Sequence, residues 1–225
     1  MKRDSQSPLN FKQNYRRSDE DDDVSHIGCT LPPGQIFLLD TNDVISEEEC
    51  DFVVSNIKKH KIDNIESIGK HTNVQCNGTT LERIAIKDQD ASAKIRDILQ
   101  KAFDKLEHKI KNLIHIGGTT QLQLREIYGA TNPHYDCPTD KEDDRMMSVI
   151  IALNDDYKGG IVHLPEQNFS CKLKKLQMIA FPPFWTHPHY VTKPLDGTVR
   201  YTVNTWLKFS RCPTISKISN KLTML

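Results

Sequence analysis

A histidine and an aspartate stand two residues apart near the middle of the chain, in the segment Asn132-Pro133-His134-Tyr135-Asp136. If this segment is extended, side chains two positions apart point to the same side, which brings the imidazole and the carboxylate together. One more histidine would complete a two-histidine, one-carboxylate site, the arrangement that holds ferrous iron and leaves positions open for a co-substrate and dioxygen. A His-x-Asp pair alone is more often structural, so its meaning depends on the residues downstream.

The downstream segment 181–191 offers the missing ligand, with histidines at positions 187 and 189. After a turn at 194–197, the run 199–207 is typical of a strand, and Arg200 and Thr202 lie on one of its faces. We expect a hairpin that sets this strand beside the one carrying the histidine. A buried guanidinium needs an anionic partner. Its two-pronged fork suits the far carboxylate of a dicarboxylic co-substrate, with the Thr202 hydroxyl as a second donor.

The elements that must position these residues are helices followed by short strands. Ser46 and Glu49 form a capping box that predicts a helix start at 47, and apolar residues at spacings of three and four predict a second helix over 92–113, ended by Gly117-Gly118. Residues 61–90 contain strand-like pieces and turns. Short apolar or alternating runs predict strands at 36–39, 120–128, 147–153, 160–164, 169–173, 177–181, 189–192 and 199–209. This order favours an α+β, mainly β fold, a barrel or double-sheet core with N-terminal helices packed on one face.

The composition and the length of the chain limit the class of protein, its location and its domain organisation. The 225 residues carry 30 basic and 30 acidic side chains, a formal net charge of zero, which excludes a uniformly cationic nucleic-acid binder. No apolar run approaches the roughly 20 residues of a membrane span, and no signal peptide is seen, so we expect a cytoplasmic protein without a membrane partner. Its six scattered cysteines favour reduced thiols. We predict a disordered charged arm over 1–30, one domain over 31–209 and a polar tail over 210–225.

Several motifs in one order resemble the Fe(II)/2-oxoglutarate-dependent dioxygenases, particularly the prolyl 4-hydroxylase-like branch. The resemblance runs from about Phe37 to Leu207. It rests on the helix opening at 45–51, the strand 121–128 before His-x-Asp, the hairpin 148–160 with its Leu-Asn and Gly-Gly pairs, and Trp185-Thr186-His187-Pro188-His189 before the basic residue. Any one of these motifs is weak evidence, whereas their order along the chain is specific.

The resemblance implies a double-stranded β-helix (jelly-roll or cupin-like) core with iron at one open end. It assigns His134, Asp136 and His189 to Fe(2+), and Arg200 to the distal carboxylate of 2-oxoglutarate, helped by Thr202 and the Tyr128 hydroxyl. His187 stays open as the third ligand and Lys193 as the anchor, because His187 directly follows the run 181–186 and the spacing from His189 to Arg200 is unusual. O2 is the second co-substrate, and ascorbate is a candidate reductant.

By the same resemblance, the predicted activity is hydroxylation of a C–H bond in a protein or peptide, with proline as the expected residue and succinate and CO2 as co-products. Two alternatives stay open: the same chemistry on a nucleic-acid base, amino acid or other small molecule, and a catalytically silent metal-binding jelly roll. The charged loop 137–145 follows the metal motif directly, and its acidic residues suggest a preference for basic peptides. The sequence does not predict an oligomeric state.

Overall fold

The computed structural model describes residues 35–63, 75–110, 116–137 and 145–209. The predicted arm 1–30, the tail 210–225 and positions 138–144 of the charged loop lie outside the described residues. In chain order the elements are β1 (Phe37–Asp40), α1 (Glu47–His60), β2 (Cys76–Thr80), α2 (Leu81–Lys87), α3 (Gln89–Ile110), β3 (Ile116–Thr119), β4 (Gln123–Ile127), β5 (Arg145–Ala152), β6 (Val162–Leu164), the 3-10 turn η2 (Pro165–Gln167), β7 (Phe169–Cys171), β8 (Gln177–Phe181), β9 (Tyr190–Val191) and β10 (Arg200–Phe209).

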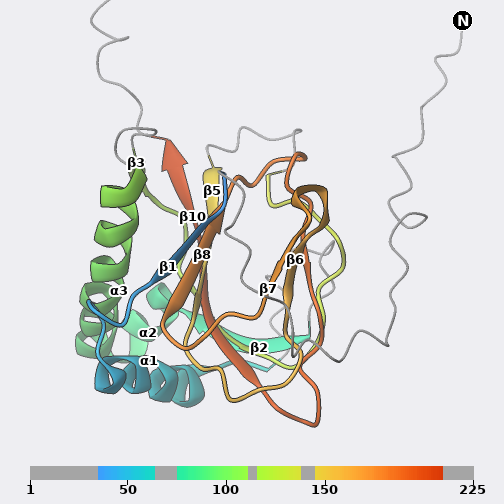
Figure 1. Ribbon diagram of the computed structural model, residues 1–225. Helices are drawn as coiled ribbons and strands as arrows, with labels where there is room; N and C mark the ends of the chain where they lie inside the picture. The colour runs from blue at the N-terminus through green and yellow to red at the C-terminus, as the bar shows by residue number, and fades with distance from the viewer. Residues whose placement is uncertain (1–34, 64–74, 111–115, 138–144, 210–225) are drawn as a thin grey trace, which may run out of the picture.

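Two antiparallel sheets form the core. The larger has seven strands in the order β1-β8-β5-β10-β4-β2, with β3 added beside β10, and the smaller has three in the order β7-β6-β9. Figure 1 shows the helices against one face of the larger sheet, and the smaller sheet on its other side. The prediction of a mainly β, double-sheet core with helices on one face is therefore confirmed, and it corresponds to a double-stranded β-helix.

Alternation along the central strands divides the apolar residues between two cores. Val149 and Ile151 of β5 and Val203 of β10 pack with the helices, whereas Ile150 and Ala152 face the smaller sheet. Because strand side chains alternate, Arg200, Thr202, Asn204 and Trp206 lie on the sheet face opposite Val203. We call this side the inner face. The inner face carries Arg200 and Thr202, which the sequence predicted to bind the co-substrate.

The helix starts follow the predicted chemistry. Ser46 accepts a hydrogen bond from the Glu49 backbone N–H at 3.2 Å, and Glu49 accepts one from the Ser46 backbone N–H at 3.0 Å, so the capping box is present. The apolar repeat of α3 buries Ile95, Leu99 and Leu106 against the sheet. This helix begins at Gln89, three residues earlier than predicted, and its described part ends at Ile110.

Three local predictions were wrong. The segment 61–90 contains a strand as expected, β2, but it also contains a helix that was not predicted, α2, which starts where the Thr80 hydroxyl accepts from the Arg83 backbone N–H. Gly117-Gly118 lies inside β3 rather than ending α3. The strand carrying Arg200 is not a hairpin partner of β9, because β10 pairs with β3, β4 and β5 while β9 pairs with β6. In the described part of the chain, no helix is both long enough and apolar enough to cross a membrane.

Candidate active site

His134 and His189 face each other across an isolated antiparallel bridge. The His134 backbone N–H donates to the His189 carbonyl at 3.0 Å, and the His189 N–H donates to the His134 carbonyl at 2.8 Å. Their imidazole centroids lie 4.3 Å apart. The loop after β4 is thus joined directly to the segment that leads into β9, although 55 positions separate the two residues in the sequence. A paired backbone at this point holds both rings on one side of the chain.

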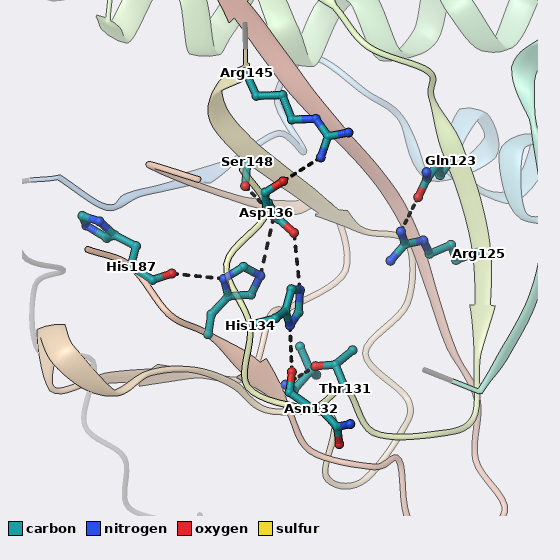
Figure 2. A network of polar contacts seen from close by, with 11 residues as sticks. Gln123, Arg125, Thr131, Asn132, His134, Asp136, Arg145, Ser148 and His187 are labelled. Atoms are coloured by element: carbon teal, nitrogen blue, oxygen red, sulfur yellow. Dashed lines mark hydrogen bonds and ion pairs between the residues drawn. The ribbon is translucent and has the colours of Figure 1, made fainter. Parts of the chain in front are cut away.

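Both imidazoles present the same nitrogen to the site. His134 Nδ1 lies 2.7 Å from the Asn132 carbonyl, and His189 Nδ1 lies 3.2 Å from the His187 carbonyl (Figure 2). A carbonyl only accepts hydrogen bonds, so each neutral ring carries its proton on Nδ1. The Nε2 lone pairs are therefore left for a metal ion, and hydrogen bonds of this kind hold metal-binding histidines in the correct tautomer.

Asp136 completes the cluster from the same loop as His134. Its Oδ1 lies 3.3 Å from His134 Nε2 and its Oδ2 lies 3.6 Å from His189 Nε2. One ligand atom from each of the three residues lies within 4.8 Å of the others, and among the described residues this is the cluster suited to a metal ion. The spacing of two in His134-x-Asp136 therefore does bring both side chains to one place, as expected from the sequence.

The surroundings of Asp136 keep its carboxylate charged and oriented. The Ser148 hydroxyl donates to Oδ2 at 2.5 Å, and the Arg145 guanidinium donates to the Asp136 backbone carbonyl at 2.7 Å (Figure 2). Burial on its own would raise the pKa of Asp136. The electrostatic interactions with His189 and His134 and the hydrogen bond from Ser148 outweigh burial and lower that pKa below its usual value. The group is consequently an anion at neutral pH.

His189, rather than His187, lies in the cluster. Burial lowers the pKa of His189 to about 4, so the ring is neutral and able to bind a cation through its lone pair. The His187 ring points away from Asp136 (Figure 2), and its Nδ1 lies 2.9 Å from the Thr186 hydroxyl. Only the backbone carbonyl of His187 contributes to the cluster, through its bond to His189.

Arg200 lies at the start of β10 with its side chain on the inner face. It is 2% exposed, and neither its Nε nor its Nη2 has a hydrogen-bond partner among the described residues. Thr202, on the same face, is fully buried and donates to Asn204 Oδ1 at 2.6 Å. The alternative anchor, Lys193, is exposed. A buried guanidinium with unused donors is energetically costly unless an anion binds it. Lys193 has no such need for an anion, because its side chain is exposed to water.

Tyr128 does not join this group, contrary to prediction. Its hydroxyl donates to Asn77 Oδ1 at 3.4 Å, and Asn77 in turn donates to Glu126. Glu126 also accepts from the hydroxyl of Tyr201, which packs with the helix-side core. Strand alternation explains why Tyr128 and Arg200 lie apart. Tyr128 is two residues from Glu126 and so points to the helix side of the sheet, whereas Arg200 points to the inner face.

Sequence reasoning did not assign a role to Ser148 or to Tyr157. Ser148 lies opposite Trp206 in the pairing of β5 with β10, and Trp206 shares the inner face with Arg200. Knowledge of this strand pairing would have placed Ser148 on the inner face as well. Tyr157 is buried beside Arg200 and donates to the Leu173 carbonyl at 3.3 Å. Burial raises the pKa of the Tyr157 hydroxyl, and the neighbouring Arg200 charge opposes that rise. No short-range pattern signals Tyr157.

The donor set fits iron and a dicarboxylate. Two neutral imidazoles and one carboxylate are the ligand types of a non-haem ferrous site. The unused buried donors of Arg200 fit the far carboxylate of 2-oxoglutarate. No fourth protein ligand joins the cluster within the described ranges, as a closed structural zinc site would require.

Comparison with known proteins agrees with this chemistry. A model of the 2OG-Fe(II) oxygenase superfamily matches residues 122–208, a range that contains the three clustered residues and Arg200. No curated protein matches the chain in sequence.

Solved structures of low sequence identity share the fold. A prolyl hydroxylase from Trichoplax adhaerens, in complex with a hypoxia inducible factor oxygen degradation domain peptide fragment, has a TM-score of 0.60 at 15% identity, covering 77% of this chain and 83% of that one. The viral collagen prolyl hydroxylase of Paramecium Bursaria Chlorella virus-1, in a 2OG complex, has a TM-score of 0.58 at 18% identity, covering 78% and 96%. A Pseudomonas putida prolyl-4-hydroxylase has a TM-score of 0.57 at 13% identity, covering 78% and 92%.

The family match spans the whole inner face of β4, β5 and β10 together with both segments that carry the histidines. This confirms the family resemblance read from the sequence motifs. Residues 122–208 match the 2OG-Fe(II) oxygenase superfamily, and the chain is an iron dioxygenase that depends on 2-oxoglutarate and uses O2.

Proposed function

We propose that His134, Asp136 and His189 bind the ferrous iron of this enzyme. The observation that carries the proposal is the convergence of two Nε2 atoms on one carboxylate, with each Nδ1 held by a backbone carbonyl. Ser148 donates to Asp136 Oδ2 and so favours the orientation of the carboxylate in which Oδ1 faces His134 and Oδ2 faces His189. The role of the protein is to fix three ligands and leave the remaining positions open.

Arg200 is the proposed anchor for the distal carboxylate of 2-oxoglutarate. Its buried, unpartnered donors support this role, since an incoming carboxylate would satisfy them and neutralise the charge. Thr202 is fully buried on the same face and is proposed to help hold the co-substrate. Bound iron and 2-oxoglutarate supply the oxidation, in which O2 is consumed, succinate and CO2 are released, and one oxygen atom enters a C–H bond of the substrate.

The proposed substrate is a peptidyl residue, and proline is the proposed target. The fold shared with three prolyl hydroxylases supports this choice. Trp185 gives independent support, because it is 67% exposed and lies two residues after Pro183. The Pro183 carbonyl accepts hydrogen bonds from the backbone N–H groups of Asp136 and Cys137, so the segment that carries Trp185 is joined to the metal-binding loop. Aromatic side chains are the surfaces on which proline-rich peptides bind in several domains.

Two measurements test the proposal. Purified protein with ferrous iron and 2-oxoglutarate labelled at the carboxylate next to the keto group should release labelled CO2, with and without ascorbate, and His134→Ala should abolish the release. A panel of proline-containing peptides and oligonucleotides, scored by a mass gain of one oxygen atom, then identifies the substrate class. CO2 release that persists in His134→Ala would contradict the iron assignment. A mass gain confined to oligonucleotides would contradict the peptide assignment.

A further inference from the structure

A second buried guanidinium, that of Arg125, lies near the proposed iron site. Arg125 is 7% exposed, and its Nη2 donates to the Gln123 side-chain oxygen. Its Nε has no hydrogen-bond partner among the described residues. Figure 2 shows the side chain reaching from β4 toward the side where His134 and Asp136 lie. In the part of the chain that the structure describes, the side chain that accepts from this charged group is a neutral amide, so no described residue compensates its charge by direct contact.

The pairing of β4 with β10 places Arg125 on the inner face. Arg125 lies directly opposite Thr202, and directly paired residues in antiparallel strands share a face. Arg200 is two residues away from Thr202 on that same face. Burial lowers the pKa of Arg125, and the charges of Asp136 and Arg200 act on it in opposite directions. Arg125, Arg200 and Asp136 therefore belong to one electrostatic neighbourhood.

The charges in this neighbourhood do not balance when the enzyme is loaded. A ferrous ion and a 2-oxoglutarate dianion cancel each other. Asp136 then offsets one of the two buried guanidinium groups, and no second carboxylate among residues 35–63, 75–110, 116–137 and 145–209 is paired with the other. Both carboxylates of the co-substrate already have proposed partners, the iron and Arg200. A buried charge without a counter-ion is strongly unfavourable, so the loaded site favours a further anion at Arg125.

We propose that Arg125 binds a carboxylate of the substrate beside the iron, and that the enzyme acts on an acidic substrate. This inference rests on the function proposed above, and it narrows the substrate to a proline-containing peptide with a glutamate or aspartate next to the target residue. The acidic loop 137–145 suggested the opposite preference, for basic peptides. The two expectations are separated by changing the charge of the peptide alone.

Anaerobic calorimetry on the protein loaded with ferrous iron and 2-oxoglutarate provides the test. The probes are acetyl-Glu-Pro-Gly-amide and acetyl-Gly-Pro-Glu-amide, each compared with the same peptide carrying glutamine or lysine in place of glutamate. For at least one pair we expect the glutamate peptide to bind about 10-fold more tightly than the glutamine peptide, with lysine weaker still. Equal affinities within both pairs, tighter binding of the lysine peptides, or no binding of any peptide would overturn the proposal.

Variants then assign the preference to Arg125. Arg125→Met should remove the difference between glutamate and glutamine peptides, Arg125→Lys should retain part of it, and Arg96→Met on α3 should leave it unchanged. The affinity for 2-oxoglutarate should stay within about 2-fold in all three variants. Loss of 2-oxoglutarate affinity in Arg125→Met with the peptide preference intact would mean that Arg125 serves the co-substrate, and would overturn the proposal. The comparison of peptides on the unmodified protein stands even where a variant does not fold.

The same peptides separate this inference from the proposed function. A glutamate peptide that binds through Arg125 and gains no oxygen atom in the presence of O2 would contradict proline hydroxylation and leave the anion site standing. Glutamate and glutamine peptides that bind equally and are both oxidised would support hydroxylation and overturn the anion site.

Discussion

The backbones of His134 and His189 hydrogen-bond to each other in both directions, at 3.0 and 2.8 Å, while their Nε2 atoms lie 3.3 and 3.6 Å from the two oxygens of Asp136. A single bridge between two distant segments thus fixes two of the three proposed iron ligands. Because a backbone bridge survives side-chain substitution, each ligand can be removed without separating the segments that carry the others.

The two neighbouring histidines provide a matched test of the iron assignment. His189→Ala should lower the affinity for ferrous iron by more than about 100-fold, because it removes one of three ligands. His187→Gln should leave iron affinity within about 3-fold, since the backbone carbonyl that holds His189 is retained. Anaerobic metal titration measures both, and circular dichroism checks the fold. Equal losses in the two variants would contradict the assignment of His189.

The choice between Arg200 and Lys193 can be tested through co-substrate binding. Arg200→Met should weaken 2-oxoglutarate binding by about 100-fold or more, because a buried charge-assisted pair is lost. Removing an unpaired buried charge should not destabilise the protein without its co-substrate. Lys193→Met, on an exposed position, should change neither property. Calorimetry of 2-oxoglutarate binding and thermal unfolding are the measurements, and a large effect of Lys193→Met would reverse the assignment.

Ser148 should tune the metal site without contacting the metal. Its hydroxyl donates to Asp136 Oδ2 at 2.5 Å, so Ser148→Ala frees the carboxylate to rotate. We expect iron affinity to fall about 10-fold, which is the usual effect of losing a hydrogen bond to a metal ligand. Ser148→Thr keeps the hydroxyl and should restore most of the affinity. If alanine and threonine have the same effect, packing at this position matters rather than the hydrogen bond.

Local patterns in the sequence were sufficient for the side chains that meet at the proposed iron site. The spacing of His134 and Asp136, the position of His189 after the apolar run 181–186 and the parity of Arg200 with Thr202 are each short-range features. The structure brings the first three residues into one cluster and puts Arg200 and Thr202 on the inner face. The prediction for Tyr128 conflicts with the same rule, because strand alternation puts Tyr128 and Arg125 on opposite faces.

The partner of each strand could not be predicted in the same way. A turn at 194–197 predicted a hairpin, yet β10 enters the middle of the larger sheet between β5 and β4. β10 has ten residues and buries side chains on both faces, Thr202 on one and Val203 and Leu207 on the other, whereas β9 has two residues and pairs with β6. That choice depends on contacts far apart in sequence. The position of Arg125 opposite Thr202 depends on the pairing of β10 with β4, so it could not be predicted from the sequence either.

Glu126 predicts how stability depends on pH. This buried carboxylate pairs with Lys61 at 2.6 Å and accepts hydrogen bonds from the side chains of Asn77 and Tyr201. Burial alone would raise the pKa of Glu126, but these hydrogen bonds outweigh burial and lower that pKa. A lowered carboxyl pKa stabilises the protein above the pKa of the unfolded chain, and the stabilisation is lost as the pH falls through the folded value.

Glu126→Gln should therefore lower the free energy of unfolding at pH 7 by about 1–3 kcal/mol. The difference from the unmodified protein should shrink as the pH falls below about 4.5, where the unfolded carboxyl also takes up its proton. Urea unfolding at several pH values measures it, with Glu82→Gln on the exposed side of α2 as the control. A difference that does not change with pH would exclude the charge of Glu126 as its cause.

Two glycines with the same backbone conformation separate strain from contact beside Arg200. Gly160 and Gly197 have φ values of +64° and +70°, so alanine at either position is strained by about 1 kcal/mol. A Cβ on Gly160 would lie 2.7 Å from Tyr157 Cε2 and 3.4 Å from Arg200 Cδ, whereas a Cβ on Gly197 would have nothing within 4 Å. The Tyr157 ring is buried and cannot move without disturbing the residue beside it.

Gly160→Ala should therefore weaken 2-oxoglutarate binding by about 10-fold and cost about 1–3 kcal/mol of stability beyond the backbone strain, because it displaces Tyr157 against Arg200. Gly197→Ala should show the strain alone and bind 2-oxoglutarate normally. Thermal unfolding and calorimetry measure the two quantities on both variants. Were both substitutions to leave co-substrate binding unchanged, the packing of Tyr157 would have no part in positioning Arg200, and the guanidinium would be held by its own strand alone.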